Sequence, residues 1–294
     1  MTLSGIIPPL PTPFNAEGAF VPEWQSGLIE RLEPQVDGFL ILGSNGEAAY
    51  LDESERREVL EAARVHIPSH KPMLAGTGGE ATRTVIKRNQ DAKDIGADYA
   101  LVLPPFYFKG LMDERVLETH YLRVADESPL PILLYNVPMA TTISLSNNLI
   151  SKLAQHENVV GLKDSSGHVG NLTDLMRRLP DDFSVFTGNA PTLLPALSLG
   201  VVGGILAVAN VAPQSYKEIV NKFRSGDVEG ARALQLSHNP LALAVTSQYG
   251  VPGLKAVLRL QGHDAGYPRA PLQDVSKTVQ TELHTLLDEA NLES

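Results

Sequence analysis

The sequence predicts an α/β protein, a closed (β/α)8 barrel followed by a helical extension, and three observations support this. Its 294 residues are enough for one α/β barrel, which takes about 250 residues, although two ordinary domains would also fit. Short apolar runs alternate with longer amphipathic segments, as in repeated βα units around a parallel sheet. After Ala207 only helical patterns follow. We therefore expect a TIM barrel over residues 1–225 and a helical extension over residues 226–294, packed against the barrel.

Eight apolar runs are the expected strands, and eight is the number of strands that closes such a barrel. Their ranges are Gly5–Leu10, Gly38–Leu42, Met73–Gly76, Tyr99–Leu103, Ile132–Asn136, Val160–Asp164, Phe183–Thr187 and Gly203–Ala207.

The segments between and after these runs have helical patterns. Glu53–Val65 carries a charged outward side and can be capped by Asp52 or Ser54, and Thr82–Ile95 stops at Gly96. The helices expected after the last strand are Pro213–Arg224, Asp227–Gln248, Pro252–Leu260 and Gln273–Glu289.

Composition excludes several classes of function. Twenty-four Lys and Arg against thirty-four Asp and Glu give a net charge of −10, which argues against nucleic acid or an anionic membrane as partner. No cysteine occurs, so there is no thiolate nucleophile and no zinc-thiolate site. The start of the chain lacks the pattern of a signal peptide, and no apolar stretch reaches about eighteen residues. We expect a soluble, cytoplasmic protein.

Lys163 is the most informative residue, because it ends an apolar run where a buried strand should stop. An ammonium in apolar surroundings loses hydration, which favours the neutral, nucleophilic amine that Schiff-base chemistry requires. A lysine here can also extend its ammonium to water or pair with Asp164. Taken alone, this segment leaves both interpretations open.

Other strand ends add polar groups at the same expected mouth, since the carboxyl ends of barrel strands converge. Ser44 and Asn45 follow the second strand, Tyr135 lies near the end of the fifth, and Gly188 and Asn189 follow the seventh. Each has a simpler interpretation, as turn residues or as a tyrosine with a hydrated hydroxyl. Their combination with Lys163 favours a catalytic site.

Four segments in order resemble the pyruvate-dependent class I aldolase superfamily, the dihydrodipicolinate synthase and N-acetylneuraminate lyase family. They are Gly43–Glu47, Tyr135–Pro138, Gly161–Ser165 and Gly203–Asn210. The resemblance extends from Gly5 to Leu292. It implies a carbon–carbon lyase that forms pyruvate, has no cofactor or metal, takes a small 2-oxo acid as substrate and assembles as a homotetramer.

The resemblance also implies a role for each site residue. Lys163 would form an imine with the C2 ketone of the substrate, and Tyr135 would relay protons. Ser44 and Asn45 fall where the family binds the substrate carboxylate, and Ile205 where a backbone carbonyl faces the imine. Gly188 and Asn189 would line the other side of the pocket.

Departures from the family pattern narrow the expected substrate. Ala140 stands where dihydrodipicolinate synthases place an arginine, which argues against their condensation reaction. Ser44–Asn45 and Ser165 are more similar to 4-hydroxy-2-oxoglutarate aldolase, with Ser165 able to meet the distal part of the substrate. Phe106 stands where relatives have a tyrosine of the proton relay, so the role of Tyr107 stays open.

We therefore expect an aldolase that cleaves 4-hydroxy-2-oxoglutarate or a 2-keto-3-deoxy sugar acid. No cation other than Lys163 ends a strand, which favours a polyhydroxylated tail contacted by Ser165, Asn189 and Thr141. The alternatives are a hydro-lyase that uses the same imine and a non-catalytic barrel that binds sugar acids. Apolar Phe106, Tyr107, Phe108 and Leu111 fit a subunit interface or an internal lid.

Overall fold

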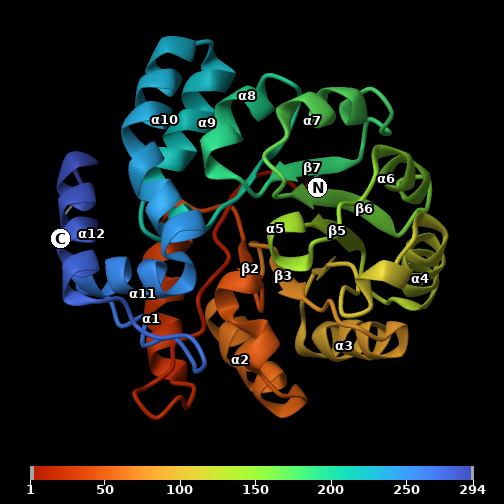
Figure 1. Cartoon of the computed structure of the whole chain (residues 1–294), viewed down its shortest axis with the longest axis horizontal. Coiled ribbons are helices and arrows are strands. Elements are labelled where there is room, and N and C mark those ends of the chain that lie inside the picture. The colour runs from red at the N-terminus through yellow and green to blue at the C-terminus, as the bar shows by residue number, and fades with distance from the viewer. Residues whose placement is uncertain (1–2, 293–294) are drawn as a thin grey trace.

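The computed structural model describes residues 3–292, and its centre is a ring of eight parallel strands (Figure 1). The strands are β1 Gly5–Ile7, β2 Phe39–Ile41, β3 Met73–Gly76, β4 Tyr99–Val102, β5 Ile132–Asn136, β6 Val159–Asp164, β7 Ser184–Thr187 and β8 Gly203–Ile205. Each expected strand is present. The first is the most shortened, because Pro8 and Pro9 have no N–H to donate to a neighbouring strand.

Closure of the ring confirms the predicted TIM barrel. Each strand pairs in parallel with the next along the chain from β2 to β8, and β8 pairs with β1. Strands β1 and β2 are the two ends of this order, and backbone hydrogen bonds join the segments that follow and form them. Leu10 N–H donates to the Leu40 carbonyl at 2.9 Å, and Leu40 N–H donates to the Pro8 carbonyl at 3.1 Å.

Alternation along the strands separates two buried layers, because successive side chains point to opposite faces. One face fills the inside of the barrel with Ile7, Leu40, Leu74, Leu101, Leu133, Phe186 and Ile205. The other face packs against the surrounding helices and belongs to the larger core.

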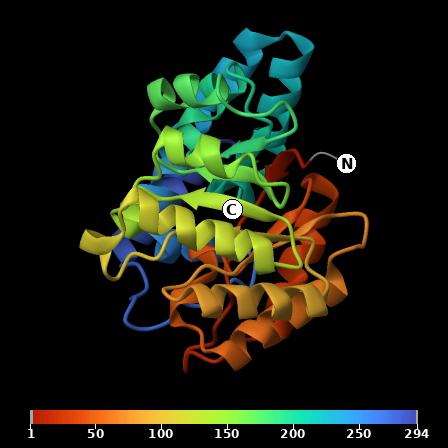
Figure 2. The ribbon, with the colours of Figure 1, turned by 90° about the vertical axis from the view of Figure 1, so that its right-hand side faces the viewer.

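Helices form the outer layer, and in Figure 2 the orange to yellow-green ones lie in front of the strands. They are α1 Pro22–Leu32, α2 Glu53–His66, α3 Thr82–Ile95, α4 Glu114–Glu127, α5 Pro138–Thr141, α6 Asn147–Leu153, α7 Val169–Met176, α8 Leu193–Leu197 and α9 Pro213–Ser225. Asp52 caps α2 by accepting hydrogen bonds from the N–H groups of Ser54 and Glu55, both at 2.9 Å. Gly96 ends α3 with φ at +101°.

The remaining helices are α10 Val228–Leu243, α11 Gly250–Leu260 and α12 Lys277–Glu289, which lie to one side of the barrel in Figure 1. The expected helix Asp227–Gln248 is regular only to Leu243. It continues as a wider π-helical turn, Ala244–Gln248, in which Tyr249 N–H donates to the Ala244 carbonyl at 3.0 Å. Within residues 3–292, none of the helices combines the length and apolar character needed to cross a membrane.

Candidate active site

One cavity of about 290 Å³ at the carboxyl ends of the strands brings together the site residues expected from the sequence, with the exception of Thr141. Its lining includes Ser44, Asn45, Tyr135, Lys163, Ser165, Gly188, Asn189 and Ile205. These residues come from five different strand ends, so their proximity depends on closure of the barrel.

Lys163 and Tyr135 form the centre of this cavity. They are directly paired residues of β6 and β5, and the Lys163 Nζ lies 4.4 Å from the centroid of the Tyr135 ring. The two residues are only 4% and 5% exposed. Within residues 3–292 no carboxylate lies within ion-pair distance of Lys163, and Asp164 instead accepts a hydrogen bond from Asn136 Nδ2 at 2.7 Å. Alternation along β6 explains this, because neighbouring residues point to opposite faces.

The environment of Tyr135 makes its hydroxyl more acidic than that of an ordinary tyrosine. Burial by itself raises the pKa of a phenol, but the Lys163 ammonium and hydrogen bonds with Ser44, Ser165 and Lys163 outweigh it, so the pKa of Tyr135 lies below its ordinary value. The Ser44 hydroxyl lies 3.5 Å from the Tyr135 hydroxyl. The phenol can therefore exchange a proton with a group bound beside the amine.

The loop after β2 presents Ser44 and Asn45 to the cavity. Ser44–Gly46 forms a single 3₁₀ turn, and the Gly46 carbonyl accepts a hydrogen bond from the Thr12 hydroxyl at 2.7 Å. Ser44 is exposed to the cavity whereas Gly46 is buried. The turn thus leaves its polar side chains free to meet an anionic group while its backbone is anchored.

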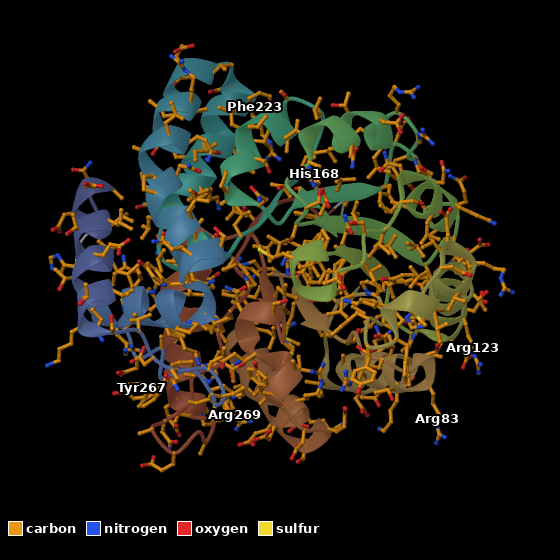
Figure 3. The ribbon with its side chains drawn as sticks, in the orientation of Figure 1. Arg83, Arg123, His168, Phe223, Tyr267 and Arg269 are labelled. Carbon is orange, nitrogen blue, oxygen red and sulfur yellow. The ribbon has the colours of Figure 1, made fainter. Side chains whose placement is uncertain are left out.

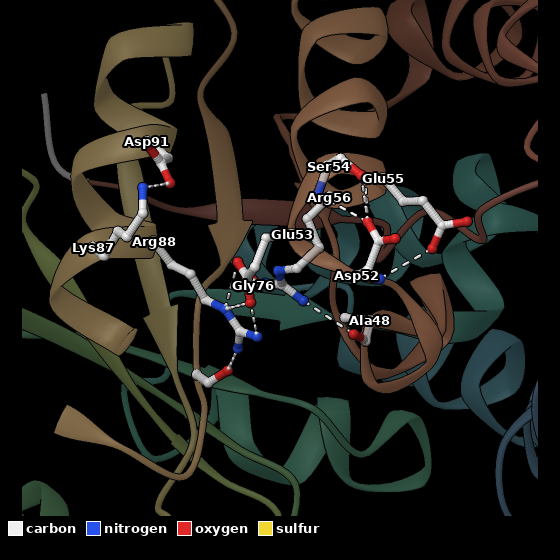
Figure 4. Close-up of polar contacts among 11 residues, drawn as sticks. Ala48, Asp52, Glu53, Ser54, Glu55, Arg56, Gly76, Lys87, Arg88 and Asp91 are labelled. Atoms are coloured by element: carbon white, nitrogen blue, oxygen red, sulfur yellow. Dashed lines mark hydrogen bonds and ion pairs between the residues drawn. The ribbon is translucent and has the colours of Figure 1, made fainter. Parts of the chain in front are cut away.

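Figure 4 shows the contacts that support this loop from outside the cavity. Arg56 of α2 donates to the Ala48 carbonyl at 3.0 Å and to the Gly76 carbonyl, and so joins the loops after β2 and β3. Burial lowers the pKa of Arg56 to about 10, which still leaves it cationic at neutral pH. Arg88 of α3 pairs with Glu53 at 2.6 Å and also donates to the Gly78 carbonyl.

Gly188 allows β7 to approach the amine. A Cβ atom at this position would lie 1.9 Å from the Ser165 Oγ and 2.9 Å from the Lys163 Cε. Its backbone N–H donates to the Asp164 carbonyl at 2.6 Å. Any larger residue here would force the side chains of Ser165 and Lys163 to move, so the requirement for glycine is steric rather than one of backbone dihedral angle.

The far end of the cavity is polar but uncharged. Its lining includes Ser165 and Asn189, and the Asn189 Oδ1 is buried with no hydrogen-bond partner among the described residues. Among residues 3–292, Lys163 is the only charged side chain in the lining of this cavity, which also includes Ala140.

Thr141 does not take the place expected for it. Its hydroxyl is buried in hydrogen bonds with the Val137 carbonyl at 3.2 Å and the Ile143 carbonyl at 3.1 Å, and it does not line the cavity of Lys163. The sequence also failed to indicate Thr246 and Ser247, which line the cavity from the π-helical turn. Their segment has an ordinary helical pattern, and only contacts with the barrel place it over the site.

A second cavity of about 610 Å³ adjoins the first, sharing Ser44 and Tyr135 with it. Phe106 lines the second cavity, whereas Tyr107 lines neither and is 76% exposed. Within one chain, Tyr107 therefore has no contact with the centre of the site.

Comparison with known proteins adds independent information. The dihydrodipicolinate synthetase family matches residues 2–290. A 4-hydroxy-tetrahydrodipicolinate synthase of Exiguobacterium sp. is 30% identical over 98% of each chain. Dihydrodipicolinate synthase of Aquifex aeolicus has a solved structure that is 32% identical, with a TM-score of 0.93 and coverage of 99% of each chain.

A third similar protein is YagE, an E. coli K12 prophage protein of the dihydrodipicolinic acid synthase family. Its structure in complex with pyruvate is 31% identical, with a TM-score of 0.93, and the match covers 99% of this chain and 100% of YagE.

Proposed function

The chain belongs to the dihydrodipicolinate synthetase family, and from this premise we propose that it is a class I aldolase which reversibly cleaves a 4-hydroxy-2-oxo acid to pyruvate and an aldehyde. The observation that carries the proposal is the buried amine of Lys163 beside the phenol of Tyr135, in a cavity lined by hydroxyl and amide groups. The structure of YagE with pyruvate supports pyruvate as one ligand.

Imine formation is the first step. The neutral amine of Lys163 adds to the C2 ketone to give a carbinolamine, which loses its hydroxyl as water when a proton is supplied. Tyr135 is placed to supply this proton, and Ser44, 3.5 Å from its hydroxyl, can relay it. Ser44 and Asn45 would bind the substrate carboxylate.

Cleavage of the C3–C4 bond follows from the protonated imine. The C4 hydroxyl gives up its proton, an aldehyde leaves, and the bonding electrons move into the imine to form the enamine of pyruvate. Protonation of the enamine at C3 and hydrolysis by water release pyruvate and free Lys163. Tyr135 is left as a phenolate once it has protonated the hydroxyl of the carbinolamine, and its lowered pKa favours this form, so it can take the first proton and return the second.

The lining of the cavity favours a 2-keto-3-deoxy sugar acid as substrate over 4-hydroxy-2-oxoglutarate. Beyond Lys163 the lining offers uncharged hydroxyl and amide groups, including Ser165, Asn189 and Ser247. A second carboxylate would meet no cation there, whereas a polyhydroxylated tail can exchange hydrogen bonds with these groups.

A second candidate is the condensation performed by 4-hydroxy-tetrahydrodipicolinate synthases, because relatives at 30–34% identity carry that name. Ala140 argues against it, since its methyl group offers no charge to an aldehyde substrate with a carboxylate. Dehydration of a sugar acid through the same imine gives different products, so product analysis separates it from cleavage. A non-catalytic barrel would have no need of the buried amine.

The decisive experiment is intact mass spectrometry after incubation with pyruvate and borohydride, followed by peptide mapping. A reduced pyruvyl adduct confined to Lys163, and absent from Lys163→Met, is the expected result. A panel of 4-hydroxy-2-oxo acids then identifies the substrate by its aldehyde product. Folded protein that forms no adduct would overturn the proposed mechanism.

We also propose that the protein assembles as a homotetramer. Tyr107, Phe108 and Leu111 lie close together in the chain and are 76%, 65% and 69% exposed. Apolar groups gathered in this way are typical of surfaces that become buried in an assembly.

A further inference from the structure

A buried ion pair joins the C-terminal helices to the barrel next to the active site. The Lys255 Nζ of α11 lies 2.6 Å from the Glu47 Oε1, and the two side chains are 0% and 1% exposed. The ammonium also donates to the Tyr267 carbonyl at 2.7 Å, while the Glu47 Oε2 accepts from the Arg269 N–H at 2.8 Å. Both carboxylate oxygens are thus used by residues that are distant in the sequence.

Glu47 directly follows the turn that presents Ser44 and Asn45. It has φ at +52° and ψ at +32°, a left-handed conformation that favours glycine or asparagine, and its N–H donates to the Ser44 carbonyl at 3.1 Å. A glutamate in this conformation costs backbone energy, which the contacts of its carboxylate offset. The end of the turn is therefore held by the side chain of Glu47.

Arg269 holds the continuation of the same segment. Its guanidinium pairs with Glu55 at 2.6 Å and donates to the Tyr50 carbonyl at 3.0 Å. Figure 3 labels Arg269 and Tyr267 in the loop between α11 and α12. Both cations lie near the ring of Phe14, whose centroid is 4.6 Å from the Lys255 Nζ and 4.2 Å from the Arg269 Cζ.

Helix α11 also takes part in the site directly, because Gly250 and Val251 at its start line the cavity of Lys163. One helix therefore contributes to the wall of the cavity and, one turn later, is joined by Lys255 to Glu47 in the loop after β2. The ion pair does not reach the reacting atoms, since neither Lys255 nor Glu47 lines the cavity of Lys163.

We infer that Lys255 and Glu47 are positioning residues, which hold the Ser44–Asn45 turn in the conformation that binds the substrate carboxylate. This inference rests on the proposed function, because it presumes a 2-oxo acid bound at that turn. Removing one member leaves the other charge buried and unpaired, so the turn must rearrange to restore its solvation.

The test measures borohydride trapping of pyruvate at several pyruvate concentrations in Lys255→Met, Glu47→Gln and the double variant. The double variant removes both charges of the buried pair, so it remains informative if a single variant fails to fold. Asp274→Asn is the control, because Asp274 pairs at 2.7 Å with Arg259 of the same helix and does not touch the turn. Hydrogen exchange of residues 43–50 is a second measurement, independent of activity.

The expected result is a half-saturating pyruvate concentration raised about tenfold, with a saturated trapping rate that stays within about threefold of the wild type. The half-saturating pyruvate concentration of the double variant should be little higher than that of either single variant, since the two side chains act as a unit. Exchange of the turn amides should accelerate in all three, and not in Asp274→Asn.

Two other results have different meanings. Half-saturation and turn exchange that stay at wild-type values in folded variants would overturn the positioning role and leave the aldolase proposal intact. Wild-type protein that forms no adduct would overturn the proposed function and, with it, a positioning role for a 2-oxo acid.

Discussion

Tyr135 and Lys163 are directly opposite each other on neighbouring parallel strands, with the Lys163 Nζ 4.4 Å from the Tyr135 ring centroid. The pairing places an amine and a phenol side by side without any loop to hold them. A shift of the strand register by one residue would turn one of them out of the cavity, so the barrel itself determines this geometry.

Tyr135→Phe should lower kcat about 10²–10⁴-fold, because the proton relay is lost while the amine remains. Trapping of pyruvate on Lys163 should persist at a lower rate. The lowered pKa of Tyr135 means that its phenol loses its proton at a lower pH than an ordinary tyrosine. The fall in wild-type activity at alkaline pH should therefore begin below the ordinary tyrosine range and disappear in the variant. An unchanged pH–rate profile would contradict this role.

Gly188→Ala should reduce the rate of adduct formation at least about tenfold, because the new methyl group would displace Ser165 and the Lys163 side chain. Gly170→Ala is the matched control, since a Cβ atom there meets nothing within 4 Å. Helix α7 should tolerate that change, or the protein should become more stable by about 0.5–1 kcal/mol. Equal trapping rates in the two variants would show that the close approach of β7 is unimportant.

Asn189→Ala should lower kcat/KM for a 2-keto-3-deoxy sugar acid about tenfold, because the substrate tail loses a hydrogen-bonding side chain from the lining of the cavity. Pyruvate trapping should stay within about twofold of the wild type, since pyruvate has no tail. Steady-state assays with the sugar acid and trapping rates with pyruvate check this. Parallel losses for pyruvate and the sugar acid would place Asn189 at the imine instead.

The double variant Tyr107→Arg/Leu111→Arg should dissociate the proposed tetramer, because two charges would be buried in an apolar contact. Val65→Arg is the control, since Val65 is 79% exposed on α2, away from the Tyr107–Leu111 segment. Equilibrium sedimentation measures the mass of each. A monomeric wild type would rule out the interface.

His120 should make stability depend on pH between about 4 and 6.5. Burial lowers the pKa of His120 from 6.5 to about 4, so in this range the unfolded chain binds a proton that the folded chain does not. The free energy of unfolding is therefore highest above pH 6.5. It decreases by at most about 3 kcal/mol as the pH falls toward 4. Urea unfolding of wild type and His120→Leu checks this, with the exposed His70→Gln as control. Equal pH slopes in wild type and His120→Leu would contradict it.

Local patterns identified most of the fold. Met73–Gly76 and Ile132–Asn136 were predicted with the bounds that the structure has, because each is an apolar run between clear breaks. The first strand was predicted too long, since apolar character alone does not register the missing N–H groups of Pro8 and Pro9. The π-helical turn Ala244–Gln248 was not predicted, because its residues have an ordinary helical pattern.

The sequence by itself determined the order of βα units, the strand that carries Lys163 and the types of side chain at the strand ends, because hydrophobic periodicity is a local property. Only the tertiary structure decided which of these side chains meet. Closure of the barrel placed Tyr135 against Lys163, kept Thr141 out of the lining of that cavity and brought Ser247 over it. It also joined Lys255 to Glu47 across 208 residues, since the partners of a buried charge are set by packing between distant segments.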